Sequence, residues 1–196
     1  MLALPSAAAP APRRQLFVGT ALACVAAGAL IGSMLALWMR FRLAALQAPD
    51  SLWIPKGIKV PMVPANTMLL CFVPIAIFAQ WAVWAARRDA RTQTSFALAL
   101  VAIIGIAIVN AQAYIYARMN MPITGKNATA FNAMFYAVTA TFTLLVVFGI
   151  GFSVITAFRY LGGRTSDREI VAAHALYWYF LGALFSALWF VVYVTK

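Results

Sequence analysis

The sequence predicts an all-α, polytopic membrane protein whose chain crosses the bilayer five times in one helical bundle. Hydrophobic residues make up 65% of the 196 positions and charged residues only 10%, whereas a soluble domain is about half apolar and a quarter charged. The apolar residues form five runs, each longer than the roughly 20 residues that a helix needs to cross a membrane. Because the charged residues lie between these runs, we expect the runs to be the membrane spans.

The N-terminal part contains a tail, the first span and the longest connection. Residues 1–14 are rich in alanine and proline and are expected to form a disordered tail. The apolar run that follows, at 16–39, is longer than the core of a secretory signal peptide, so it is interpreted as a membrane span. The connection over 40–63 contains three prolines, which predict an extended loop.

Four further spans complete the bundle, and with the first they form a single domain over residues 15–196. Pro64 suits the first turn of the second span, where a backbone N–H is not needed for helical hydrogen bonding. The later connections are short, so successive helices are expected to be antiparallel neighbours. These four spans are expected at residues 64–86, 94–117, 129–158 and 170–194.

The formal net charge of +11 comes from basic residues in the connections. Such residues are typical of loops that set membrane orientation beside anionic lipid, and the chain has no extended soluble part that would bind nucleic acid. Eight basic residues lie on the side of the N-terminus and seven on the other. The dense cluster "ARRDAR" at 86–91 predicts that the N-terminus lies inside and the C-terminus outside.

No Asp, Glu, Lys or Arg lies within any expected span. Pumps and ion-coupled transporters keep such residues in the membrane although each costs about 3 kcal/mol, so the sequence argues against a self-contained transporter. It also offers no general acid or base in the membrane interior. Cys24 and Cys71 lie in apolar runs and are expected to act as small hydrophobes. The sequence therefore predicts no catalytic, cofactor-binding or metal-binding residue in this chain.

The only histidine, His174, lies about one turn into the fifth span. A haem b held between helices needs two axial ligands, and the second would here be a methionine such as Met119 or Met134. The simpler interpretation is a histidine at the membrane interface, beside the aromatic residues that follow it. The sequence favours this interpretation and keeps the haem b anchor as an alternative.

Small and aromatic residues mark candidate contact sites. Small residues four positions apart let membrane helices approach closely, and we expect helix contacts, within the chain or with a partner, at Gly28, Gly32, Gly182 and Ser186. Aromatic residues near span ends are typical of the interfacial belt. Lipid or interface anchoring is therefore expected at Trp81, Trp84, Trp178 and Tyr179.

The third span ends in four polar residues that form two i,i+4 pairs. Asn110 pairs with Tyr114, and Gln112 pairs with Tyr116. Hydrogen bonds between helices and contact with lipid headgroups are two functional interpretations. An ordinary polar helix end explains the cluster equally well.

Three stretches, taken in order, carry the pattern of a known family. "AQAYIY" at 111–116 retains Gln112 and Tyr116 of the pattern Gly-Gln-x-x-Glu-Tyr, and the run from Tyr177 to Gly182 retains the first two aromatic residues and the Phe of Tyr/Phe-Trp-His-Phe-x-Asp. "FYAVTATFTLLVVFGI" at 135–150 fits Phe-Tyr-x-x-Thr-Gly-x-His-x-x-His-Val-x-x-Gly at Phe135, Tyr136, Thr139, Val146 and Gly149. Together they resemble subunit III of haem–copper respiratory oxidases, in its five-helix bacterial form, over roughly residues 15–195.

The ionisable residues of that family pattern are missing from this sequence. The carboxylate of the family's first helix has no counterpart in "VGTALACVAAGALIGSM". Two histidines, one glutamate, a third histidine and an aspartate are replaced at Phe142, Leu145, Ile115, Tyr179 and Gly182, respectively. Family roles tied to those residues, such as support of proton uptake, are therefore not carried over.

The resemblance implies a non-catalytic accessory subunit of a terminal oxidase in aerobic respiration. Such a subunit packs on the catalytic subunit I, holds phospholipid in a cleft between helix groups, and shapes an apolar path for oxygen. Haem and copper are expected in the partner subunit, with cytochrome c or quinol as electron donor, in a bacterial inner (cytoplasmic) membrane. The alternatives are a haem b anchor of a dehydrogenase, a small transporter or channel component, and a subunit III relative in another respiratory complex.

Overall fold

The computed structural model describes residues 14–48, 52–125, 128–164 and 168–195, and over these residues the chain is all-α. Five helices are long and apolar enough to cross a membrane, as the sequence predicts. The last of them ends in a π-helical turn, η1. The elements are α1 (Gln15–Gln47), α2 (Met62–Arg87), α3 (Arg91–Met119), α4 (Ala130–Leu161), α5 (Arg168–Leu188) and η1 (Trp189–Val194).

The main difference from the expected spans is the end of α1. This helix runs to Gln47, whereas the expected span ends at Met39. Arg40 and Arg42 are good helix formers, and their long side chains can reach the interface from within a helix, so basic residues do not end the helix here. The connection that follows is shorter than expected and buries Trp53. Of the expected tail, residues 1–13 lie outside the described part of the chain.

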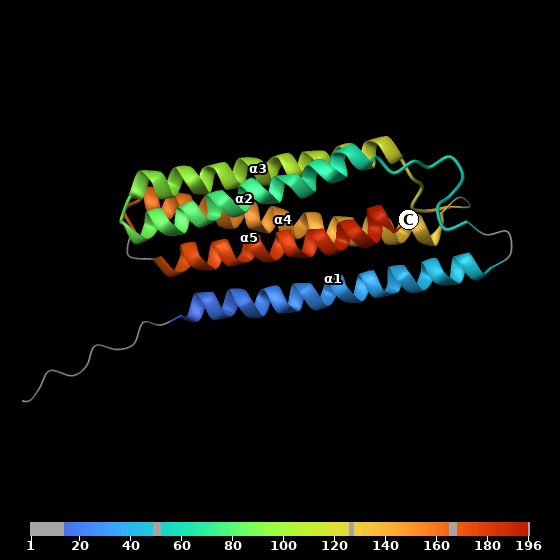
Figure 1. Ribbon diagram of the computed structural model, residues 1–196, viewed down its shortest axis with the longest axis horizontal. Coiled ribbons are helices and arrows are strands. Elements are labelled where there is room, and N and C mark those ends of the chain that lie inside the picture. The colour runs from blue at the N-terminus through green and yellow to red at the C-terminus, as the bar shows by residue number, and fades with distance from the viewer. Residues whose placement is uncertain (1–13, 49–51, 126–127, 165–167, 196) are drawn as a thin grey trace, which may run out of the picture.

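Four of the helices form a ring, and α1 lies along one side of it (Figure 1). In this ring α3 packs on α2 and α4, while α5 packs on α2 and α4 from the other side. α1 contacts α5 and α4. Because each connection reverses the direction of the chain, α1, α3 and α5 run parallel and begin at the same end of the bundle.

α1 is held by one narrow seam. Its buried residues are Cys24, Ile31 and Trp38, a seven-residue spacing that matches helices packed as in a left-handed coiled coil. The rest of its surface is open, and Leu22 and Val25 are 65% and 69% exposed. Most of α1 therefore faces lipid or another protein.

Two adjacent residues at the start of α5 fasten the ends of three other helices. Glu169 Oε1 accepts a hydrogen bond from the backbone N–H of Phe17 at 2.9 Å, in the first turn of α1, where such donors lack helical partners. Arg168 Nη2 donates to both carboxylate oxygens of Asp89 at 2.7 and 3.0 Å. Asp89 lies in the turn between α2 and α3, so this end of the bundle is closed by α5.

Candidate functional site

The four small residues expected at helix contacts divide into two groups. A Cβ added to Gly28 would lie 3.4 Å from the Phe180 ring, and one added to Gly182 would lie 3.4 Å from Phe72. These two glycines therefore face neighbouring helices of the same chain. Gly32 has no such neighbour within 4 Å, and Ser186 is exposed, so both face the outside of the bundle.

The tightest helix contact involves two other glycines and Trp178. A Cβ on Gly105 of α3 would lie 2.9 Å from Trp178 Cη2 and 2.8 Å from Ile150 Cγ1, and one on Gly149 of α4 would lie 3.0 Å from Trp178 Cζ2. The indole thus fills a slot that only glycine leaves open. The sequence analysis looked for pairs of small residues four positions apart. Gly105 has no such partner, so it was not predicted as a contact site.

The expectation that Trp178 anchors the chain in lipid is wrong. Its side chain is 1% exposed, and its Nε1–H donates to Ser153 Oγ of α4 at 3.0 Å. The two glycines leave space for the indole ring inside the bundle, and Ser153 supplies the acceptor that a buried indole N–H needs.

His174 lies inside the bundle, near the end where α5 begins. It is fully buried, and its Nε2 lies 2.7 Å from Ser153 Oγ. Ser153 donates its own proton to the Gly149 carbonyl at 2.9 Å, so its two lone pairs are left for Trp178 and His174. This pattern places the imidazole proton on Nε2. The Ser153–His174–Trp178 cluster therefore joins α4 to α5.

The two methionines that could pair with His174 as haem ligands lie at the other end of the bundle. Ser153, which contacts His174, is 19 residues from Met134 along α4, or about 28 Å at 1.5 Å per residue. Met119 ends α3 beside the start of α4. Two axial ligands must bind one iron from opposite faces, so neither methionine is placed to share it with His174.

The other aromatic candidates lie at the bundle surface or partly within it. Trp84 is 45% exposed and stacks under the Arg88 guanidinium at 3.6 Å from the ring centre. Tyr179 is 39% exposed, and its hydroxyl donates to Gln80 Oε1 at 2.8 Å. Trp81 is partly buried and packs edge-on against Phe96. These placements fit an aromatic belt at the Arg87 end of α2.

The polar cluster at the end of α3 divides between the inside and outside of the bundle. Gln112 is buried, and its Oε1 accepts from the Tyr193 hydroxyl at 3.3 Å. Tyr116 Oη lies 2.8 Å from Thr139 Oγ1. Since Thr139 donates its proton to a backbone carbonyl of α4, Tyr116 is the donor. Asn110 and Tyr114 are exposed.

Two hollows on the surface share one face of α4. The first, the α1–α4 groove, holds about 360 Å³ and is lined by Thr20, Ala23, Ala27, Leu145, Phe148, Phe152 and Tyr177. The second, the arginine pocket, holds about 510 Å³ and is lined by Ile155, Phe158, Arg159, Gly162 and Arg164. Residues 148, 152, 155 and 159 are three or four positions apart, so they follow one side of the helix.

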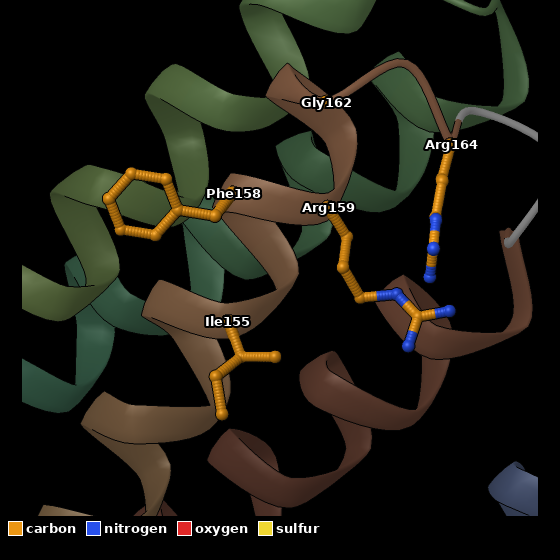
Figure 2. Close-up of a pocket in the computed structure, with 5 residues that line it drawn as sticks. All are labelled: Ile155, Phe158, Arg159, Gly162 and Arg164. Carbon is orange, nitrogen blue, oxygen red and sulfur yellow. The ribbon is translucent and has the colours of Figure 1, made fainter.

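Figure 2 shows the Arg159 and Arg164 side chains reaching toward each other, from the last turn of α4 and from the segment beyond Gly162. Guanidinium groups bind phosphate through paired, charge-assisted hydrogen bonds. Apolar side chains along one side of α4, with two arginines at the end of the helix, are surfaces of the kind that acyl chains and phosphate groups bind. The sequence analysis interpreted both arginines only as signals of membrane orientation. That their side chains meet in one pocket depends on the turn after α4, which the sequence does not reveal.

A scan against models of known protein families found no family that matches this chain.

Proposed function

We propose that this protein is a non-catalytic accessory subunit of a haem–copper terminal oxidase, of the subunit III kind, in a bacterial inner membrane. It packs on the catalytic subunit and holds phospholipid against it. Haem and copper belong to the partner. The chain contributes helix surfaces and a lipid groove, and no reacting group.

One observation carries this proposal: positions that match the family pattern are packing positions. Phe135 and Val146 are fully buried, and Thr139 and Gln112 hydrogen-bond other helices. Gly149 borders the slot that holds Trp178. A random set of apolar helix residues would include many that face outward. The matched residues instead face the inside of the bundle, which supports a shared helix arrangement with the family.

Two of the five positions where the family carries ionisable residues also support this interpretation. Phe142 is 3% exposed and packs on Phe72 and Phe185, with ring centres 6.2 and 5.1 Å away. Ile115 is fully buried. Apolar side chains fill these places without leaving buried polar atoms, so the helical frame is retained while proton-handling groups are lost.

The alternative of a haem b anchor is less well supported. It requires a second ligand near His174, and Met119 and Met134 lie near the opposite end of the bundle. The Nε2 of His174 is also engaged by Ser153. The hydrogen bond between His174 and Ser153 gives the histidine a role in helix packing, and this role does not require a bound haem.

The proposal is tested by purifying the full chain from native membranes in mild detergent. We expect it to carry a haem- and copper-bearing subunit in equal amounts, identified by mass spectrometry and by the reduced optical spectrum. His174→Ala should leave the haem content per partner subunit unchanged. Isolation of the chain as a folded monomer from membranes that contain the oxidase contradicts the proposal, as does a haem spectrum from the chain alone.

We further propose that the N-terminus lies inside and the C-terminus outside. Several described basic residues lie at the end of the bundle where α5 begins, and this favours that end as cytoplasmic. They are Arg87, Arg88, Arg91, Arg164 and Arg168. Single cysteines in a Cys24→Ala, Cys71→Ala background test this. Lys56→Cys should react with an impermeant maleimide in intact cells, and Arg88→Cys should react only after lysis; the reverse pattern refutes the orientation.

A further inference from the structure

Three guanidinium groups gather at the turn that follows α4. Arg159 and Arg164 line the arginine pocket and reach toward each other (Figure 2). The third group comes from the first residue of α3, because Arg91 Nη1 lies 4.0 Å from the point that a Cβ on Gly163 would occupy. Gly163 has a φ of +90°, and the turn through it lets the backbone N–H of Arg164 donate to the Arg159 carbonyl at 3.1 Å. Cations from α3, from α4 and from the turn are thus brought together.

The carboxylates at this end of the bundle serve other contacts. Asp89 is bound by Arg168 through both of its oxygens, and Glu169 accepts from the backbone N–H of Phe17. No carboxylate of the described residues lines the arginine pocket. The remaining acid at this end, Asp167, lies outside the described part of the chain.

The excess positive charge indicates how much charge an occupant must supply. The three guanidinium groups are always charged. The C-terminal end of α4 offers about half a negative charge, and Asp167, even counted in full, adds only one. An excess of about one and a half positive charges therefore remains. A phosphate diester carries one negative charge, whereas a phosphate monoester carries about one and a half to two near pH 7, so the monoester is the better match.

Apolar side chains beside the cations favour a phosphate that belongs to a lipid. Ile155 and Phe158 line the same pocket and are 60% and 68% exposed. They lie on α4 beyond Phe148 and Phe152, which line the α1–α4 groove. An acyl chain can lie on these side chains, whereas a soluble phosphate compound makes no use of them.

We propose that the arginine pocket binds a lipid whose headgroup is a phosphate monoester, in preference to a phosphate diester. Guanidinium groups donate paired, charge-assisted hydrogen bonds to phosphate oxygens. A monoester offers three terminal oxygens to the three arginines, and a diester offers two. The inference rests on the proposed function only in that the chain binds a phospholipid, and it holds whichever complex the chain belongs to.

The test compares two lipids with the same acyl chains and different headgroups. The full chain is purified in mild detergent, stripped of lipid, and mixed with equal amounts of phosphatidic acid, a monoester, and phosphatidylglycerol, a diester. Bound lipid is counted by native mass spectrometry at about pH 8, where the monoester is almost fully dianionic. We expect the chain to retain at least about fivefold more phosphatidic acid, as an added charge-assisted hydrogen bond allows. Equal retention of the two lipids overturns the inference.

A soluble compound with the same phosphate group tests whether the ligand is a lipid. Glycerol 3-phosphate is a monoester without acyl chains, and it should displace bound phosphatidic acid poorly even in large excess. Displacement as effective as that by phosphatidic acid itself would show that the pocket is a site for soluble phosphates, and the lipid assignment would be wrong.

A matched pair of variants tests whether the pocket makes the selection. Arg91→Gln should lower the preference for phosphatidic acid to about twofold or less, because it removes one of the three cations. Arg88→Gln makes the same change in charge at the same end of the bundle, but the Arg88 guanidinium lies 3.6 Å over the Trp84 ring, and Arg88 does not line the pocket. This control should keep the preference. Both side chains are exposed, so the thermal midpoint of the purified chain should not change.

The two variants also separate this inference from its rivals. An equal loss of preference in Arg91→Gln and Arg88→Gln would mean that the net charge of this end selects the lipid, which refutes the pocket. A chain that selects phosphatidic acid but carries no haem-bearing partner refutes the proposed function and leaves the lipid site standing.

Discussion

Ser153 joins α4 to α5 through two buried side-chain hydrogen bonds. One hydroxyl serves two buried donors, the Trp178 indole and the His174 imidazole. Ser153→Ala leaves both donors buried without a partner, at about 1 to 3 kcal/mol each. We expect the variant to lose about 2 to 4 kcal/mol of stability in denaturation of the detergent-solubilised chain.

Ser33→Ala is the matched control, because Ser33 is exposed and its hydroxyl bonds only to its own helix. Its stability should change by about 0.5 kcal/mol or less, as for surface substitutions in general. If Ser153→Ala is as stable as Ser33→Ala, the buried cluster does not hold the helices together.

Gly105 gives the second prediction at the residue scale. Gly105→Ala forces a methyl group to within 3 Å of two large side chains, one of them the Trp178 indole. Overpacking of this kind costs about 1 to 3 kcal/mol, so the thermal midpoint should fall. Gly32→Ala, which meets no atom within 4 Å, should match or exceed the wild type, since alanine is the better helix former. Equal stability of the two variants would contradict the slot described for Trp178.

Sequence reasoning found some of these residues and missed others for a clear reason. A pair of small residues four apart is a pattern within one helix, so Gly28 and Gly182 were selected, and both face another helix. Gly105 has no small residue four positions away, and Ser153, although it lies four positions after Gly149, is marked as a contact only by its two partners on α5. A contact of this kind depends on how helices are rotated against one another, which no periodicity in a uniformly apolar span reveals.

At the scale of the element, the attachment of α1 to the bundle rests on its seam and on one carboxylate. Glu169 caps the first turn of α1 from another helix, and loss of a capping side chain costs about 1 kcal/mol. Glu169→Ala should therefore speed amide hydrogen exchange at Phe17 and its neighbours about fivefold. Arg168→Ala removes an exposed ion pair, of little value in water, and should leave exchange there unchanged. Unaltered exchange in Glu169→Ala would show that the seam alone fixes α1.

The five helices were predictable because length and hydropathy alone decide which segments can cross a bilayer. Their ends were less predictable. Arg40 and Arg42 mark the edge of the apolar run, yet the helix continues through them, since charge limits insertion in lipid and does not stop helical hydrogen bonding. The π-helical turn η1 was also not predicted. It buries Tyr193, which bonds to Gln112 of α3, and this tertiary contact is not visible in the local sequence.

At the scale of the whole molecule, one side of α4 brings together two kinds of surface chemistry. The α1–α4 groove and the arginine pocket combine apolar walls with cations at the helix end, as an amphipathic lipid requires. In the proposed accessory subunit, the shape and polarity of this outer surface would organise the surrounding lipid.

The lipid side leads to the last prediction. Arg159→Gln with Arg164→Gln removes two guanidinium groups from the pocket beside α4 (Figure 2), and with them the paired hydrogen bonds to phosphate. Phospholipid that remains with the purified chain, measured as phosphorus per protein, should fall at least twofold. Lys56→Gln with Lys59→Gln makes the same change in charge on exposed residues of the connection between α1 and α2. This control should retain its lipid, because long-range attraction alone is screened by salt within about 10 Å. Equal lipid loss in both double variants would mean that net charge, and not the pocket, retains the lipid.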